Sequence, residues 1–103
     1  HAFSGSVETA QRIIDAGFLL GIGGVVTWPG ARRLPEVVRA VPATALVLET
    51  DAPDLAPEPH RGASNRPAYL ALVAAKVAAL RSWSLEETLC VTTANAKRLL
   101  QIA

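Results

Sequence analysis

The chain alternates between stretches in which apolar residues recur at helical spacing and short stretches that are almost entirely apolar. After Ser6, which favours a helix N-terminus, apolar side chains recur at helical spacing until Gly17, and this predicts a helix over residues 7–16. Residues 18–22 then form an unbroken apolar run, which is typical of a buried strand. The chain is therefore predicted to open with a helix that leads into a buried strand.

The same pair of elements is predicted a second time. Residues 31–41 have helical spacing, with Pro35 in the first turn, where proline is tolerated. Residues 46–50 begin as another apolar run and are predicted to form a second buried strand. Residues 51–66 follow as a long loop rich in proline.

The rest of the chain is predicted to be helical. An alanine- and leucine-rich helix is expected over residues 67–81. Ser84 and Glu87 match a capping box that opens another helix, and a final helix is expected over residues 94–101. Since no repeat or linker divides the chain, residues 1–103 are expected to belong to a single domain.

Strands that alternate with amphipathic helices indicate an α/β fold with a parallel sheet. A closed (β/α)8 barrel takes about 250 residues, whereas this chain has 103. We therefore expect the C-terminal portion of a TIM barrel, about strands 6–8 and their helices, or an open sheet of the same class. Residues 18–22 and 46–50 should be adjacent parallel strands joined by a right-handed crossover through residues 31–41. The N-terminal part of the barrel is expected to be a missing partner that lies outside this chain.

Composition narrows the class of protein. Hydrophobic residues make up 50% of the chain and charged residues 18%, which favours a folded globular domain. The net charge of +1 does not indicate a nucleic-acid-binding module with a basic stripe. The single cysteine excludes an internal disulfide and favours a reducing, cytoplasmic location. No apolar run is long enough to span a membrane, so no membrane partner is expected.

The candidate chemistry lies at the predicted end of the second strand. Because side chains alternate along a strand, Glu49 and Asp51 share one face, and Asp51 comes at the C-terminal end, where barrel enzymes keep their catalytic residues. A divalent ion at the mouth of a barrel would supply the charge that such carboxylates need. The alternative is a solvated strand end in which Asp51 caps a turn. His1 precedes a turn that opens a helix, and it is either a metal ligand or an uninvolved terminal residue.

Four blocks of sequence in a fixed order carry a family resemblance. They are His1-Ala2-Phe3-Ser4-Gly5-Ser6, Gly21-Ile22-Gly23-Gly24, Glu49-Thr50-Asp51-Ala52-Pro53 and Arg61-Gly62 with Asn65-Arg66-Pro67. Together they resemble signature blocks of the TatD family of metal-dependent hydrolases, and residues 93–99 are similar to that family's last helix. The loop start at residues 51–54 is most similar to the YjjV branch.

The resemblance implies a TIM barrel with one or two divalent metal ions at its mouth, with zinc, manganese and magnesium not distinguished. It implies that His1 is the histidine ligand after the sixth strand and that Asp51, at the end of the eighth, binds metal and takes a proton from the attacking water. It implies that Glu49 is a supporting acid. The family's His-x-His on the first strand, its bridging glutamate and another histidine would lie upstream of His1. This chain alone is therefore expected to bind metal poorly and to catalyse little.

The function expected of the intact protein is hydrolysis of DNA phosphodiester bonds, as in the TatD-related deoxyribonucleases. The alternatives are a non-catalytic half-barrel fragment and a metal-dependent ester or amide hydrolase, such as an aminoacyl-tRNA deacylase. Arg61, Asn65 and Arg66 are assigned to substrate binding. The guanidinium groups of the two arginines have a geometry that suits phosphate, and the alternative is that these arginines anchor the loop. Arg32 and Arg33, which follow the first predicted strand, either bind phosphate or are solvated surface charges. Trp28 either stacks on a base or packs over the barrel mouth.

Overall fold

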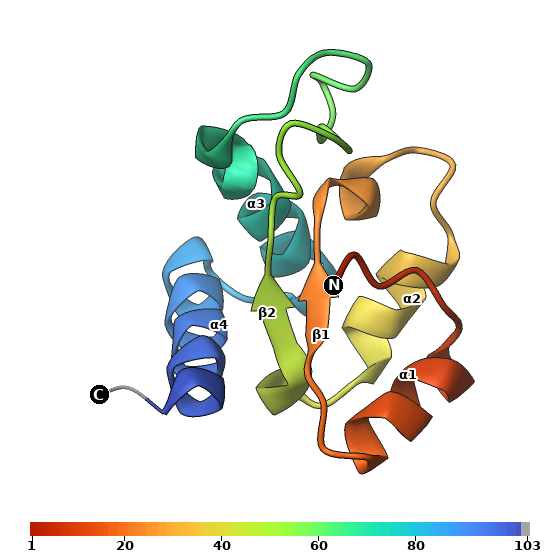
Figure 1. Cartoon of the computed structure of the whole chain (residues 1–103), viewed down its shortest axis with the longest axis vertical. Coiled ribbons are helices and arrows are strands. Elements are labelled where there is room, and N and C mark those ends of the chain that lie inside the picture. The colour runs from red at the N-terminus through yellow and green to blue at the C-terminus, as the bar shows by residue number, and fades with distance from the viewer. Residues whose placement is uncertain (102–103) are drawn as a thin grey trace.

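Two parallel strands form the centre of the structure, a computed structural model that describes residues 1–101 (Figure 1). Strand β1 (Leu20–Ile22) pairs with β2 (Leu46–Leu48), with Leu20 opposite Leu46 and Ile22 opposite Leu48. The predicted parallel pairing is confirmed, whereas the handedness of the crossover stays a prediction. Both strands are shorter than predicted, although the backbone N–H of Glu49 still donates to Ile22 O at 2.9 Å and extends the ladder by one residue.

The helices surround this pair of strands. The elements in chain order are α1 (Val7–Asp15), η1 (Gly24–Thr27), α2 (Arg33–Ala40), η2 (Ala43–Ala45), η3 (Pro67–Tyr69), α3 (Leu70–Arg81) and α4 (Leu85–Leu100), where η marks a 3-10 helix. In Figure 1, α1 and α2 lie on the side of β1 and α4 lies beside β2. The long loop between β2 and η3, drawn in green, lies at the end towards which both strands point. Strand ends and connecting loops therefore meet at one rim.

The hydrophobic core lies between the sheet and the helices α1, α2 and α3. Its largest fully buried residues include Leu20 and Ile22 of β1, Leu46 of β2 and Val73 of α3. Leu20, Ile22 and Leu46 occupy one face of the sheet, because side chains two residues apart point to the same side of a strand. The opposite face, which carries Gly21 at the paired position, is left free to hold polar side chains at the rim.

A glycine turn explains why β1 begins two residues later than predicted. The N–H of Gly17 donates to Ile14 O at 2.9 Å and the N–H of Phe18 donates to Ile13 O at 3.2 Å. With Gly17 at a φ of +94°, these bonds form a Schellman motif that ends α1. Phe18 therefore belongs to the helix cap, and its ring is 65% exposed.

The C-terminal residues form one helix, α4, and not the two helices that were predicted. The capping position is correct, since the Ser84 hydroxyl accepts a bond from the N–H of Glu87 at 3.0 Å. The helix then continues through the two threonines at 88 and 92, whose hydroxyls donate to the carbonyls four residues earlier, each at 2.9 Å. Within the described residues no single helix is long and apolar enough to cross a membrane; 67–81 and 85–100 pass that test only as a pair bent by 105°.

The first residues of the chain run beside β1 without forming a strand. Among residues 1–101 the sheet has two strands, so the predicted end of a sixth barrel strand is present only as one backbone contact. In that contact the N–H of Phe3 donates to Gly21 O at 3.0 Å. This bond places His1 and Ala2 at the same rim as the residues that follow β2.

Candidate active site

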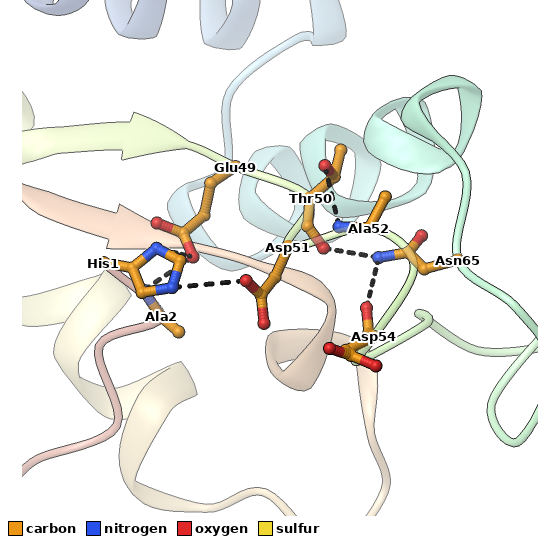
Figure 2. Close-up of polar contacts among 8 residues, drawn as sticks. All are labelled: His1, Ala2, Glu49, Thr50, Asp51, Ala52, Asp54 and Asn65. Carbon is orange, nitrogen blue, oxygen red and sulfur yellow. Dashed lines mark hydrogen bonds and ion pairs between the residues drawn. The ribbon is translucent and has the colours of Figure 1, made fainter.

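Three side chains predicted from the sequence meet at this rim. His1 Nε2 lies 3.3 Å from Asp51 Oδ1, and His1 Nδ1 lies 3.6 Å from Glu49 Oε1. The imidazole is 77% exposed, while the side chains of Glu49 and Asp51 are 20% and 30% exposed. Figure 2 shows the ring between the two carboxylates, each of which comes from the chain just after β2. The prediction that Glu49 and Asp51 share one face is confirmed by their common approach to His1.

Glu49 is held by backbone contacts on both sides. Its own N–H continues the strand ladder, and its Oε1 accepts a hydrogen bond of 2.6 Å from the N–H of Ala2. Its carboxylate lies directly over Gly21, where a Cβ would overlap Glu49 Oε2. A glycine within a strand often marks such a close approach. Gly21 was part of a family block, but its role here, to leave room for the Glu49 carboxylate, was not predicted.

Asp51 turns the chain away from the strand. Its φ of +56° lies in the left-handed region, which aspartate and asparagine tolerate better than most residues. Its carbonyl accepts a bond of 2.9 Å from the N–H of Asp54, which closes the turn. The alternative interpretation of Asp51 as a turn residue therefore describes its backbone, while its side chain points to His1.

Asn65 fixes this turn from the far end of the loop. Its side-chain Nδ2 donates to Asp54 O at 2.8 Å and makes a second, short bond to Thr50 O. Its Oδ1 accepts from the N–H of Arg66 at 2.8 Å, and the residue is 5% exposed. With both amide hydrogens bound to backbone carbonyls, Asn65 positions Asp51 from behind (Figure 2). These contacts favour a positioning role over the substrate contact that was predicted for it.

The loop of residues 51–66 is fastened to η1. Thr27 Oγ1 accepts from the N–H of Glu58 at 2.8 Å, and Trp28 Nε1 donates to Ala56 O at 2.9 Å. At Gly24 a Cβ would overlap Leu55 O, so the two segments pack backbone against backbone. The two connections after β1 and β2 therefore form one wall of the rim.

The arginines assigned to substrate binding lie further along the same loop. Arg61 Cζ lies 4.0 Å from the centroid of the Trp28 ring, so its guanidinium stacks on the indole. The side chain of Arg66 is exposed, and the structure places neither arginine in contact with His1 or Asp51. His60, on the same loop, stacks on Tyr69 with 4.1 Å between ring centroids.

Residues 1–101 match the family model described as TatD related DNase. The chain belongs to the TatD family. The uncharacterized metal-dependent hydrolase YabD of Bacillus subtilis is 43% identical over 102 residues, which is 99% of this chain and 40% of that protein. YcfH of Escherichia coli, described in the same words, is also 43% identical, with 99% and 38% covered. The chain thus spans about 40% of the length of the relatives it matches.

The solved structures agree with this membership. The crystal structure of YjjV, a TatD homologue from Escherichia coli, superimposes with a TM-score of 0.93 at 35% identity over 100% of this chain and 40% of YjjV. A TatD family hydrolase from Entamoeba histolytica superimposes with a TM-score of 0.75 at 20% identity, over 94% of this chain and 40% of that one, and shows the fold alone. The prediction of a partial TatD fold is confirmed, while its strand numbering and the YjjV branch stay predictions.

The spacing of two side chains at the rim matches that of two ligands of one divalent ion. Two ligand atoms bound at about 2.0–2.1 Å to one tetrahedral ion lie about 3.4 Å apart, and His1 Nε2 and Asp51 Oδ1 are 3.3 Å apart. Glu49 faces the other ring nitrogen, where a carboxylate commonly orients a metal-binding histidine. Within residues 1–101 no group of three or more His, Cys, Asp or Glu side chains can hold a metal ion. This chain thus offers part of a ligand set.

Proposed function

We propose that the full-length protein containing this chain is a metal-dependent hydrolase that cleaves phosphodiester bonds of DNA. The observation that carries the proposal is the pairing of His1 Nε2 with Asp51 Oδ1 at the carboxyl end of the strands, with Glu49 behind the imidazole. The names of the relatives support a divalent metal, and the description of the family supports DNA as the substrate.

Asp51 and His1 are proposed as two of the metal ligands. The ion, once bound, would polarise a phosphoryl oxygen and make water a better nucleophile. Asp51 is 30% exposed in its side chain, so it retains access to solvent from which it can take the proton of an attacking water. Glu49 is 20% exposed and already bonded to the N–H of Ala2, which suits it to hold His1 in place.

The same constellation would also serve an ester or amide hydrolase, since the metal chemistry is shared and substrate choice depends on loops. The arginines of the 51–66 loop favour an anionic substrate: Arg61 and Arg66 are exposed on the connection that carries Asp51. We therefore assign them to phosphate contact in the assembled protein, and the N-terminal part of the barrel is proposed to supply the remaining ligands.

The test compares Asp51→Asn with Asp54→Asn in the full-length protein. Both changes remove one carboxylate from the same turn, but only Asp51 faces His1, while the Asp54 side chain is exposed. We expect Asp51→Asn to lose bound metal and several orders of magnitude in turnover on a single-stranded DNA substrate. Asp54→Asn should retain both.

Metal content by atomic emission and hydrolysis of DNA, of a small phosphodiester and of an aminoacyl ester are measured side by side. Unchanged metal content and turnover in Asp51→Asn would contradict the proposal. If the aminoacyl ester were hydrolysed in preference to both phosphodiesters, the proposal of DNA as the substrate would be wrong. The proposal of a metal site at His1 and Asp51 would still hold.

A further inference from the structure

A groove on the outer wall of the molecule, between η1, α2 and α3, gathers positive charge. Residues that line it include Trp28, Arg32, Glu36, Arg39, Lys76 and Leu80. The groove has a volume of about 380 Å³. The groove is distinct from the site at His1 and Asp51, because the residues that line it include neither of them.

The cations in this groove are not neutralised by the protein. Among the described residues the ion pairs join His1 to Glu49 and to Asp51, so Arg32, Arg39 and Lys76 lie within 4.0 Å of no carboxylate. All three are exposed. Three cations against the single carboxylate of Glu36 leave the groove with an excess of positive charge, which attracts anions.

Two of the cations are separated along one helix. Arg32 and Arg39 are seven residues apart at the start and near the end of α2, a separation of about 10 Å along a helix. A single phosphate is bound by donors that converge on one point, whereas a row of cations matches a row of phosphates. The spacing therefore favours a chain of phosphates over a free nucleotide.

One end of the groove adjoins the 51–66 loop. Trp28 lines the groove, is tied to the 51–66 loop by its bond to Ala56 O, and carries the guanidinium of Arg61 on its ring. An aromatic ring next to a row of cations is the combination with which proteins hold single-stranded nucleic acid. A strand whose reacting phosphate lies at the rim could thus continue past Arg61 and Trp28 into the groove.

We propose that this groove binds the part of a single-stranded nucleic acid substrate that extends beyond the cleaved bond. The inference rests on the proposed phosphodiesterase function, since it names where that substrate runs. Helix α2 has 8 residues and is about 12 Å long, so the groove can take a short stretch of an extended strand. Arg32, Arg39 and Lys76 bind phosphates of this strand, and Trp28 contacts the base nearest the 51–66 loop.

Binding is measured without catalysis. The full-length protein is titrated into a fluorescently labelled oligothymidylate of about ten nucleotides, in EDTA so that nothing is cleaved, at several salt concentrations. Arg39→Ala/Lys76→Ala is compared with Arg12→Ala/Lys97→Ala, which removes the same charge from exposed positions on α1 and α4. A third variant, Glu36→Gln, removes the negative charge of the groove.

We expect the groove double variant to lose about tenfold in affinity and to reduce the slope of log K against log salt by about 1.4, as for two lost phosphate contacts on a single strand. The control pair should keep the parent slope, and Glu36→Gln should bind more tightly, a gain that misfolding does not produce. Equal losses in both double variants, or a duplex bound as tightly as the single strand, would overturn the proposal. Hydrolysis of a small phosphodiester by the metal-loaded parent tests the catalytic function separately.

Discussion

Asp51 combines two demands at one position, a left-handed backbone and a carboxylate directed at His1. Few residue types meet the first, because a side chain at a φ of +56° crowds the backbone, and aspartate and asparagine are favoured exceptions. This separates the structural role of the residue from its chemical role. Substitutions can therefore be chosen that remove one role and keep the other.

Asp51→Asn is expected to leave the stability of the full-length protein nearly unchanged, whereas Asp51→Ala should lower it by about 1 kcal/mol. The reason is that asparagine accepts the left-handed conformation and alanine does not. Urea unfolding of the metal-free proteins measures the difference. Equal stability of the two variants would show that the turn imposes no strain on residue 51.

Gly21 is expected to be intolerant of even a methyl group. Gly21→Ala should cost about 1–3 kcal/mol through overpacking and should displace the carboxylate of Glu49, which lies over the glycine. The displaced carboxylate would release His1, so metal affinity should fall as well. The matched control is Gly30→Ala, since a Cβ there meets nothing within 4 Å. Metal titration followed by calorimetry distinguishes the two variants, and equal affinities would argue against the positioning role of Glu49.

At the residue scale, alternation along the strand predicted that Glu49 and Asp51 face the same way, although β2 ends at Leu48 and Asp51 faces His1 from a left-handed turn. The placement of His1 beside them came from the family resemblance, and the observed distance of 3.3 Å to Asp51 agrees with it. The two hydrogen bonds from the Asn65 side chain could not be predicted from the sequence. They reach carbonyls 11 and 15 residues away, across a loop with no periodic pattern. Side-chain bonds to backbone depend on a loop path that sequence pattern does not specify.

At the scale of elements, the 51–66 loop owes its path to three fasteners: Asn65 on the turn, Thr27 on Glu58 and Trp28 on Ala56. None of them belongs to an α-helix or a strand, although Thr27 is the last residue of the 3-10 helix η1. Helix and strand positions were predicted within a few residues by hydrophobic spacing, whereas α4 was predicted as two helices, one opened by Ser84 and one over residues 94–101, and is a single helix.

Asn65→Ala should lower the free energy of unfolding by about 1–3 kcal/mol, because Thr50 O and Asp54 O each lose a hydrogen-bond donor. It should also lower turnover while leaving metal affinity less affected, since Asp51 keeps its charge but loses its support. Thermal unfolding and limited proteolysis of the loop report the change. Ser64→Ala, an exposed neighbour, serves as the control; if it behaved like Asn65→Ala, the hydrogen bonds of Asn65 would have no special importance.

At the scale of the whole molecule, the described residues leave apolar surface uncovered. The side chains of Leu85, Leu89, Leu99 and Leu100 on α4 are between 44% and 65% exposed. Two strands also leave unpaired edges, which in a barrel would be covered by neighbouring strands. The relatives, of which this chain matches about 40%, have additional chain that is proposed to cover these surfaces.

The isolated segment of residues 1–103 is therefore expected to bind a hydrophobic dye strongly and to associate at micromolar concentration, whereas the full-length protein should do neither. Dye fluorescence and light scattering at matched concentrations give the comparison. If the segment stayed monodisperse, melted cooperatively and caused no increase in dye fluorescence, these surfaces would be stable in water. That result would then revive the interpretation of the segment as an independent, non-catalytic unit.

The fastening of the 51–66 loop to η1 also bears on how such proteins are re-engineered. A loop exchanged between two relatives keeps its shape only if its anchoring points travel with it. Here those points, Gly24, Thr27 and Trp28, lie in another βα connection, about thirty residues earlier in the chain. A chimera designed around the loop alone would separate it from its anchors, so the smallest transferable cassette comprises both connections, residues 23–28 and 51–66.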